Sequence, residues 1–300
     1  MNRKHLLAVW IAALALCTLT FAQREVRSAE ATRAEKGDAP RMEKIRLSPQ
    51  EGKMNTTAQV PIFGNQRFSL GIPETIGERR GMILNFPGVE IHWNPPEESG
   101  AVSYRYVAEG NVDYSVRLVP DADFVDVEMR VKNVSEKGWR EVFFFNCLNP
   151  TAAPAFKDWK LERTYMSKDG RPFRMDGTTR INEGPQPFMK TLQFYVHEDY
   201  DPVSKFVEGF RSTSPDKTDG SYIVTMSEDG GSYMGATSPK SVFLFNNLDR
   251  CCIHSAPTFG DIGPGEEKKV TARLYFGKGS LEDFLKRYYA DSPEAKPKDE

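Results

Sequence analysis

Side chains capable of chemistry gather in two segments, each of which follows a phenylalanine-rich run. The first segment, residues 149–165, offers an amide, two carboxylates, an arginine and two aromatic rings: Asn149, Asp158, Trp159, Glu162, Arg163 and Tyr165. The second, residues 249–261, contains two further aspartates, an arginine, two cysteines and His254. Carboxylates and arginine hydrogen-bond hydroxyl groups, and an aromatic ring can stack on the apolar face of a sugar. This combination favours a polar, uncharged ligand such as a mono- or oligosaccharide.

His254 is the candidate for acid–base chemistry, because the ordinary pKa of histidine is about 6.5. If the protein is an enzyme, we expect His254 to act with Asp158 or Glu162. The alternative is a loop histidine that hydrogen-bonds a carbonyl group, beside carboxylates that form surface ion pairs with Arg163. Trp93 is a further candidate for ligand contact, either at the rim of a site or as an anchor of its loop.

The cysteines indicate one disulfide bond. Cys17 lies in the apolar N-terminal segment, which leaves Cys147, Cys251 and Cys252 in the body of the chain. Three cysteines in an oxidising compartment predict one bond and one free thiol. We expect Cys147 to pair with one of the other two, because a bond between adjacent Cys251 and Cys252 would be strained.

No motif in the sequence indicates a metal or a cofactor. The chain has no His-Glu-x-x-His, no Cys-x-x-Cys and no glycine-rich phosphate loop. The adjacent cysteines are poorly placed to hold one metal ion in tetrahedral geometry. We therefore expect neither a metal nor a cofactor.

The N-terminal residues have the pattern of an export signal. Arg3 and Lys4 precede an apolar run from Leu6 to Leu16, and Ala22 ends a small-residue cleavage site. The run is shorter than the ~20 residues that cross a bilayer comfortably, so cleavage is expected and a retained anchor is the alternative. We predict a signal peptide over residues 1–22, a periplasmic or secreted protein, and no membrane span after cleavage.

Charge and composition define the rest of the organisation. The net charge is −2, with 40 basic and 42 acidic residues interleaved along the chain. Nucleic-acid binding normally needs a concentrated basic stripe, so this class of partner is excluded. Residues 23–54 are charged and poor in aromatics, which predicts a disordered linker. Residues 55–292 form one predicted domain, and residues 293–300 a flexible tail.

Alternating patterns predict a mostly β, antiparallel sandwich. In the run 124–132, apolar Val125, Val127, Met129 and Val131 alternate with charged residues, as in a strand with one buried face. Turn sequences rich in glycine separate such runs. One short C-terminal helix is predicted, with Ser280 as N-cap, Asp283 completing a capping box, and an apolar stripe behind them.

Two runs repeat each other: residues 142–149 (VFFFNCLN) and residues 242–249 (VFLFNNLD). Both are apolar on successive positions, so each is predicted to be a central strand that is covered on two faces. If the two strands are equivalent in the two halves of a sandwich, the segments that follow them open at the same end. Chance similarity of phenylalanine-rich strands is the alternative.

The stretch from Val125 to Val134, then Trp139, then Phe143 to Asn149, resembles the middle of galactose-mutarotase-like β-supersandwich domains. The resemblance covers about residues 60–290 and implies a carbohydrate-associated fold, with either epimerase chemistry or binding alone. Aldose epimerases carry a histidine pair and a late catalytic glutamate. The pair has no counterpart in this chain, and Glu266 and Glu267 lie in a predicted turn.

We therefore predict an exported carbohydrate-binding β-sandwich protein. The first alternative is a carbohydrate-active enzyme, a sugar epimerase or a lyase-like protein, that uses His254 with Asp158 or Glu162. The second is a structural or interaction module of the cell envelope with no small ligand. Convergence of the two chemically rich segments on one concave face would favour a ligand over the envelope module.

Overall fold

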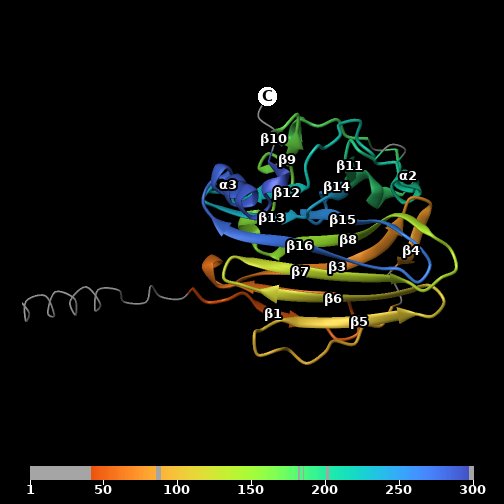
Figure 1. Cartoon of the computed structure of the whole chain (residues 1–300). Coiled ribbons are helices and arrows are strands. Elements are labelled where there is room, and N and C mark those ends of the chain that lie inside the picture. The colour runs from red at the N-terminus through yellow and green to blue at the C-terminus, as the bar shows by residue number, and fades with distance from the viewer. Residues whose placement is uncertain (1–41, 86–88, 182, 185, 201–202, 297–300) are drawn as a thin grey trace, which may run out of the picture. The chain divides into compact units, whose positions relative to one another are not determined.

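The computed structural model describes residues 42–85, 89–181, 183–184, 186–200 and 203–296. Within these residues the chain from Glu43 onward forms one compact unit, made of two antiparallel sheets stacked as a sandwich (Figure 1). The predicted fold class is thus confirmed. None of the helices in the described part of the chain is both long and apolar enough to cross a membrane.

The first sheet has eight described strands, with the strand order β1-β2-β3-β8-β15-β14-β11 and β4 paired to β3. In chain order the strands are β1 (Arg46–Pro49), β2 (Asn55–Val60), β3 (Gln66–Glu78), β4 (Gly81–Asn85), β8 (Trp139–Ala152), β11 (Leu192–Val196), β14 (Ser241–Asn247) and β15 (Cys252–Ile262). The long strands β3, β8 and β15 form its middle.

The second sheet also has eight described strands, in the order β10-β9-β12-β13-β16-β7-β6-β5. They are β5 (Val102–Ala108), β6 (Val112–Pro120), β7 (Phe124–Asn133), β9 (Thr164–Lys168), β10 (Arg171–Arg174), β12 (Tyr222–Met226), β13 (Ser232–Thr237) and β16 (Glu267–Lys278). The alternation predicted for β7 is confirmed, since the apolar members are buried between the sheets while Glu128 is exposed.

The main core fills the space between the two sheets. Phe68 of β3 contacts Phe276 of β16 with ring centroids 5.0 Å apart, and Tyr114 of β6 meets Phe144 of β8 at 5.9 Å. Because side chains of a strand alternate between faces, the neighbours Phe143 and Phe145 point to the outer face of the first sheet. They belong there to a separate aromatic cluster.

Two helices cover the outer faces of the sandwich (Figure 1). Helix α2 (Lys205–Phe210) adds Phe206 and Phe210 to the aromatic cluster on the first sheet. Helix α3 (Leu281–Asp291) packs Phe284 and Tyr288 against the second sheet. The predicted capping box is present at Ser280 and Asp283. Five short 3-10 helices complete the described elements: η1 (Pro61–Phe63), η2 (Pro154–Phe156), η3 (Met175–Gly177), η4 (Pro187–Thr191) and η5 (Pro293–Ala295).

The two repeated runs are β8 and β14, and they lie in one sheet instead of in two halves of the sandwich. Both are antiparallel to β15, which lies between them, so they run parallel to each other. Their C-terminal ends therefore lie at the same end of this one sheet. The prediction of central strands with two covered faces is confirmed.

Three boundaries differ from those predicted. Strand β1 falls within the predicted linker 23–54, because residues 46–49 pair with β2 and Ile45 is buried. Most of the segment 249–261, predicted to be a loop, is strand β15, which is paired on both sides. The predicted tail 293–300 begins with η5. The predicted signal peptide, residues 1–22, lies outside the described residues.

Candidate functional site

A bulge in β3 brings a carboxylate onto the outer face of the first sheet. Gly71 pairs with Cys147 of β8 and Thr75 pairs with Phe145, so three residues of β3 stand opposite one residue of β8. The extra residues end in Glu74, whose carboxylate folds back over Gly71. A Cβ atom at Gly71 would lie 3.1 Å from Glu74 Oε1, and glycine leaves this space free.

His254 holds this carboxylate from below. It lies in β15 directly opposite Cys147 of β8, and Nε2 is 3.2 Å from Glu74 Oε2. Its ring stacks on Phe145 at a centroid distance of 4.6 Å and meets Phe245 edge to face. The histidine side chain is 3% exposed and that of Glu74 is 33% exposed, so Glu74 is the member of the pair that a ligand can reach.

Glu74 lines a cavity of about 670 Å³, which we call the Glu74 pocket. Phe145 forms part of its base, and helix α2 contributes Phe206 and Phe210. Met82 of the β4 strand and Met189 of η4 add further apolar wall. The volume is within the range of small-molecule sites, and an apolar lining with few polar groups is typical of them.

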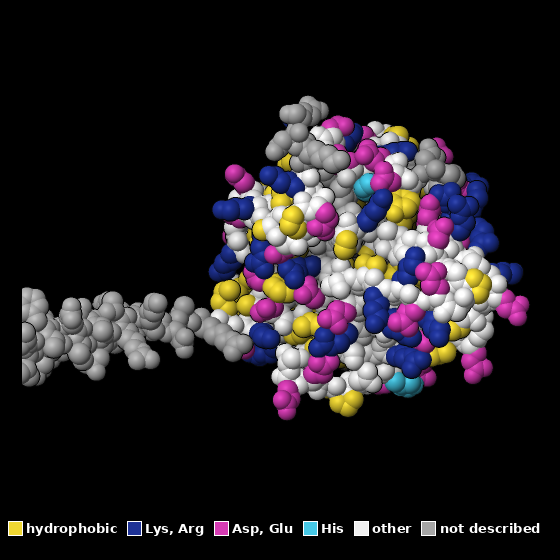
Figure 2. Space-filling view, viewed as in Figure 1, with side chains coloured by type: hydrophobic (Ala, Val, Ile, Leu, Met, Phe, Trp, Pro, Cys, Tyr) yellow, Lys and Arg dark blue, Asp and Glu magenta, His cyan; other side chains and the backbone are white. Residues whose placement is uncertain are grey.

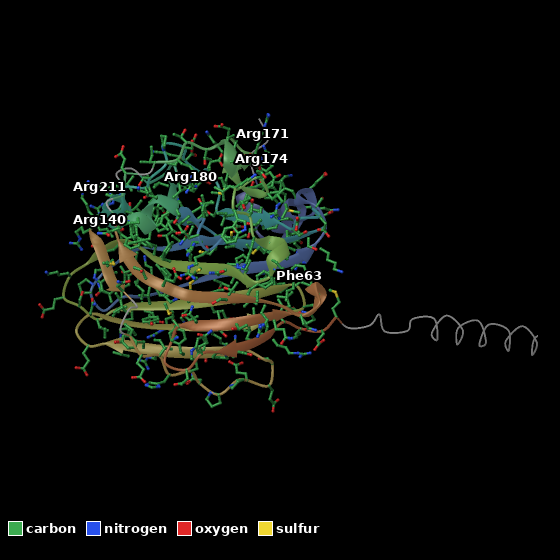
Figure 3. All side chains as sticks on the ribbon, turned by 180° about the vertical axis from the view of Figure 1, so that it is seen from behind. Phe63, Arg140, Arg171, Arg174, Arg180 and Arg211 are labelled. Atoms are coloured by element: carbon green, nitrogen blue, oxygen red, sulfur yellow. The ribbon has the colours of Figure 1, made fainter. Side chains whose placement is uncertain are left out.

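Three charged side chains line this pocket: Glu74, Arg80 and Lys205. Arg80 Nε lies 3.0 Å from Glu78, and Lys205 Nζ lies 2.5 Å from Glu208, so both cations have carboxylate partners. Figure 3 shows Arg211, which follows α2 directly, on the same side of the molecule as Arg140. The pocket therefore combines the Glu74 carboxylate with two cations that are already paired.

Burial and charge set the ionisation of the pair. Burial acts to raise the pKa of Glu74, but the hydrogen bond and charge of His254 outweigh it, and this pKa lies below its ordinary value. Burial acts to lower the pKa of His254, while the charges of Cys252 and Glu74 raise it above its ordinary value. The two shifts agree in direction, since both favour an imidazolium facing a carboxylate.

Two of the three described cysteines lie beside this pair. Donor atoms of Cys147, Cys252 and His254 are all within 4.8 Å of one another. The hydrogen bond between the two thiols lowers the pKa of Cys252 and raises that of Cys147. Cys251 is different: its backbone has a φ of 52° at the turn before β15, and its Sγ lies 3.7 Å from the carbonyl oxygen of Leu248.

The structure holds all three described cysteines as free thiols, so the predicted disulfide is absent from it. The predicted proximity of Cys147 to one of the adjacent cysteines is found, and that cysteine is Cys252. A disulfide requires a sulfur–sulfur distance of about 2.05 Å. Whether the two thiols pair on export stays a prediction.

The structure gives His254 the partner Glu74, and not the predicted Asp158 or Glu162. Asp158 is buried and accepts hydrogen bonds from the Arg163 backbone N–H at 2.8 Å and from Thr164 Oγ1 at 2.9 Å. Glu162 is exposed. His254 lies within a central strand, and its partner comes from the bulge of β3. The residues near His254 in sequence therefore do not identify that partner.

The other predicted ligand-binding residues are used in local structure. The Arg163 guanidinium donates to the carbonyl oxygens of Ala155, Lys157 and Met226, which closes its loop. Trp93 Nε1 donates to the carbonyl of Lys53 at 2.8 Å, and the Trp93 ring packs on Tyr104.

Three other predicted contact residues, Asn149, Tyr165 and Trp159, also lie outside the lining of the Glu74 pocket. Asn149 accepts a hydrogen bond from Thr151, and Tyr165 packs beside the aromatic cluster of α3. Trp159 is 54% exposed, and Lys157 lies near its ring. None of the predicted site residues is among the described residues that line the Glu74 pocket.

One sequence signal could have indicated Glu74. The run Gly71-Ile-Pro-Glu-Thr75 places a glycine and a proline inside an otherwise apolar strand pattern. Such residues mark bulges, and bulges are frequent beside active sites because they redirect a side chain. The pattern does not, however, name the histidine that the redirected carboxylate meets.

The visible surface has no extended area of one charge. Figure 2 shows lysines and arginines intermixed with aspartates and glutamates over the face in view. Ion pairs across this kind of surface are common in the described residues, for example Arg117 with Glu97 and Glu128. This face therefore lacks the basic stripe that binds nucleic acid.

No family model matches the chain, and no curated protein matches it in sequence. Solved structures do match in fold. An α-N-acetylgalactosaminidase from Bifidobacterium bifidum, in complex with GalNAc, is 11% identical with a TM-score of 0.50, over 84% of this chain and 38% of that one.

Two smaller proteins also match. A galactose mutarotase-like protein from Lactobacillus casei ATCC 334 is 10% identical with a TM-score of 0.47, over 77% of this chain and 99% of that one. A galactose mutarotase related enzyme from Lactobacillus acidophilus is 8% identical with a TM-score of 0.44, over 79% and 98%. The chain is similar in structure to galactose-mutarotase-like proteins at low sequence identity, and these are the proteins that its sequence resembles.

Proposed function

We propose that this chain is a carbohydrate-binding protein and that the Glu74 pocket is its ligand site. One observation carries the proposal: a carboxylate lines an aromatic pocket of about 670 Å³ and is held in place by a buried histidine. A carboxylate fixed in this way accepts hydrogen bonds from hydroxyl groups, and the rings of Phe206 and Phe210 offer surface for the apolar face of a sugar. Lys205 and Arg80, which also line the pocket, add donors for further hydroxyl groups.

The fold supports the same class of ligand. Its match to a structure solved with GalNAc shows that this arrangement of strands occurs in a protein that binds a sugar. The Glu74 pocket lies on the outer face of the first sheet, beside helix α2. Its volume of about 670 Å³ accommodates a sugar of one or two rings.

Isothermal titration calorimetry of the mature chain against a panel of neutral, acidic and N-acetylated monosaccharides and short oligosaccharides tests the proposal. Saturable binding of at least one neutral sugar is expected, with competition among sugars that share the bound hydroxyl pattern. Absence of binding across the panel, for a folded protein, would favour the envelope module that needs no small ligand.

A second function, sugar epimerase or lyase-like chemistry, is favoured by the Glu74–His254 pair. A positioned acid–base residue contributes about 10²–10⁴-fold to a rate, so Glu74→Gln should reduce turnover by that factor. Polarimetry of a freshly dissolved anomer, and ultraviolet detection of an unsaturated product, measure the two reactions. Binding without turnover in either assay assigns the chain to the binding class.

Export is part of the proposal and rests on Arg3, Lys4, the apolar run 6–16 and Ala22. In a host that exports the protein, N-terminal sequencing should begin at or near Gln23. Recovery of the intact chain with Met1 from the cytoplasm would contradict it. Periplasmic and secreted forms are separated by fractionation of the same culture.

A further inference from the structure

Behind the Glu74 pocket, two thiols and an imidazole lie close together in the middle of the first sheet. Cys147 of β8 stands directly opposite His254 of β15, and Cys252 precedes His254 by two residues on the same strand. Because side chains alternate with a period of two, Cys252 and His254 share one face of the sheet. We call Cys147, Cys252 and His254 the thiol–histidine cluster.

The cluster is compact and sealed from water. Its donor atoms lie within 4.8 Å of one another, and the exposed fractions of Cys147, Cys252 and His254 are 6%, 4% and 2%. His254 Nδ1 is buried and makes no hydrogen bond of ordinary geometry to the described residues, although the backbone of Phe245 also acts on this ring. Two buried thiols and a buried imidazole at this spacing are the donor types that bind zinc.

We propose that Cys147, Cys252 and His254 form a binding site for one thiophilic divalent cation, of which Zn²⁺ is the representative, with Glu74 as the adjacent carboxylate. Zinc bonds cysteine sulfur at about 2.3 Å and histidine nitrogen at about 2.0–2.1 Å, so tetrahedral donors lie roughly 3.3–3.8 Å apart. The donors of the cluster, which lie within 4.8 Å of one another, reach this spacing by a contraction of about 1–1.5 Å at most. Two thiolates and an imidazole select zinc-like ions over Mg²⁺ or Ca²⁺, which prefer oxygen.

Glu74 completes the environment of the site. Its carboxylate lies beside both His254 and Cys147, and its side chain is 33% exposed toward the pocket. It therefore supplies negative charge next to the cation and lies on a route from solvent to the cluster. The proposed metal site shares Glu74 and His254 with the proposed sugar site, but it does not depend on which sugar binds.

The structure also explains why the sequence argued against a metal. Cys251 and Cys252 are adjacent, but the left-handed backbone at Cys251 turns its thiol toward Leu248. Only Cys252 faces the cluster, so the strain of two neighbouring ligands on one ion does not arise. The third donor comes from β8, more than a hundred residues away in sequence.

The test uses the mature chain, reduced and stripped with a chelator, then titrated with Zn²⁺ by calorimetry and with Co²⁺ by absorption spectroscopy. One cation per chain is expected, with a thiolate-to-cobalt charge-transfer band in the near ultraviolet. Cys147→Ser, Cys252→Ser and His254→Asn should each weaken Zn²⁺ binding by 100-fold or more. Cys251→Ser is the matched control and should bind Zn²⁺ as the parent does.

A second measurement uses the unaltered protein, so it remains decisive even if the variants fail to fold. In the unaltered protein, Zn²⁺ should protect Cys147 and Cys252, and not Cys251, from alkylation as read by peptide mass spectrometry. Equal protection of all three thiols, unchanged Zn²⁺ affinity in the cluster variants, or loss of affinity in Cys251→Ser would each overturn the proposal. So would a Cys147–Cys252 disulfide in the exported protein together with no Zn²⁺ binding after reduction. Sugar titrations of the metal-free protein separate a failed metal site from a failed sugar site.

Discussion

Glu74 and His254 are 180 residues apart in sequence, yet His254 Nε2 lies 3.2 Å from Glu74 Oε2. The bulge of β3 supplies the carboxylate, and the central strand β15 supplies the histidine. Solvent reaches the carboxylate but not the ring. His254 therefore fixes the orientation of the Glu74 carboxylate from the buried side, while the carboxylate itself faces the pocket. An acceptor in a fixed position is what the recognition of a hydroxyl group requires.

Removing the charge of Glu74 should weaken carbohydrate binding. Glu74→Gln keeps the size of the side chain, and hydrogen bonds to charged groups contribute about 1.5–3 kcal/mol, so an affinity loss of about tenfold or more is expected. Calorimetry with the sugar found in the screen measures it. Trp159→Ala is the control, since this ring is exposed and outside the pocket. If Trp159→Ala weakens binding and Glu74→Gln does not, the site lies at the loop 149–165.

His254→Ala should destabilise the fold. The change removes a buried ring that stacks on Phe145 and meets Phe245 edge to face, and it leaves Glu74 without its partner. A cost of about 2–4 kcal/mol in the free energy of unfolding is expected, in the range for a cavity beside a broken pair. Urea unfolding of metal-free protein measures it. His92→Ala is the control: its pair with Glu51 is largely exposed, so a change below about 0.5 kcal/mol is expected.

Because of Asp113, the free energy of unfolding should depend on pH in the acidic range. Arg105 and Arg130 both donate to this buried carboxylate, and Arg130 also meets Glu267. The hydrogen bond from Arg105 is the main cause that holds the pKa of Asp113 well below its ordinary value.

A depressed carboxyl pKa stabilises the fold above the ordinary value, near 3.8. The stabilisation is lost as the pH falls from there toward the folded-state pKa. Asp113→Asn should therefore lower the free energy of unfolding by about 2 kcal/mol at pH 7, and this difference from the parent protein should shrink below pH 4. A difference that stays constant from pH 7 to pH 2.5 in thermal or urea unfolding would contradict this assignment.

The cap of α3 should be measurable on its own. Ser280 Oγ accepts from the Asp283 backbone N–H, and the Asp283 carboxylate accepts from the backbone N–H of Ser280. Ser280→Ala should lower the free energy of unfolding by about 1 kcal/mol, as seen in calorimetric melting. Ser280→Asp retains an N-cap acceptor and should recover most of the loss. Equal effects of both changes would show that the cap is not the cause.

Local patterns in the sequence were enough to predict the sandwich and its C-terminal helix. The alternation in β7 reports a strand with one buried face, because side chains of a strand point to opposite faces in turn. The doubly apolar runs of β8 and β14 report strands with cover on both sides. The capping box depends on residues three apart, so it too can be read directly. These features depend on neighbours along the chain.

Tertiary structure alone decided the site. Whether a histidine lies in a loop or a central strand depends on which segments pair with it, and His254 is paired on both sides by runs that precede it. Glu74 faces it only because β3 carries extra residues at that point of its register. The same register brings Cys147 and Cys252 together while the backbone of one turn directs Cys251 away. Contacts between segments far apart in sequence leave no periodic trace in either segment, so the composition of the site follows from the packing of β3, β8 and β15.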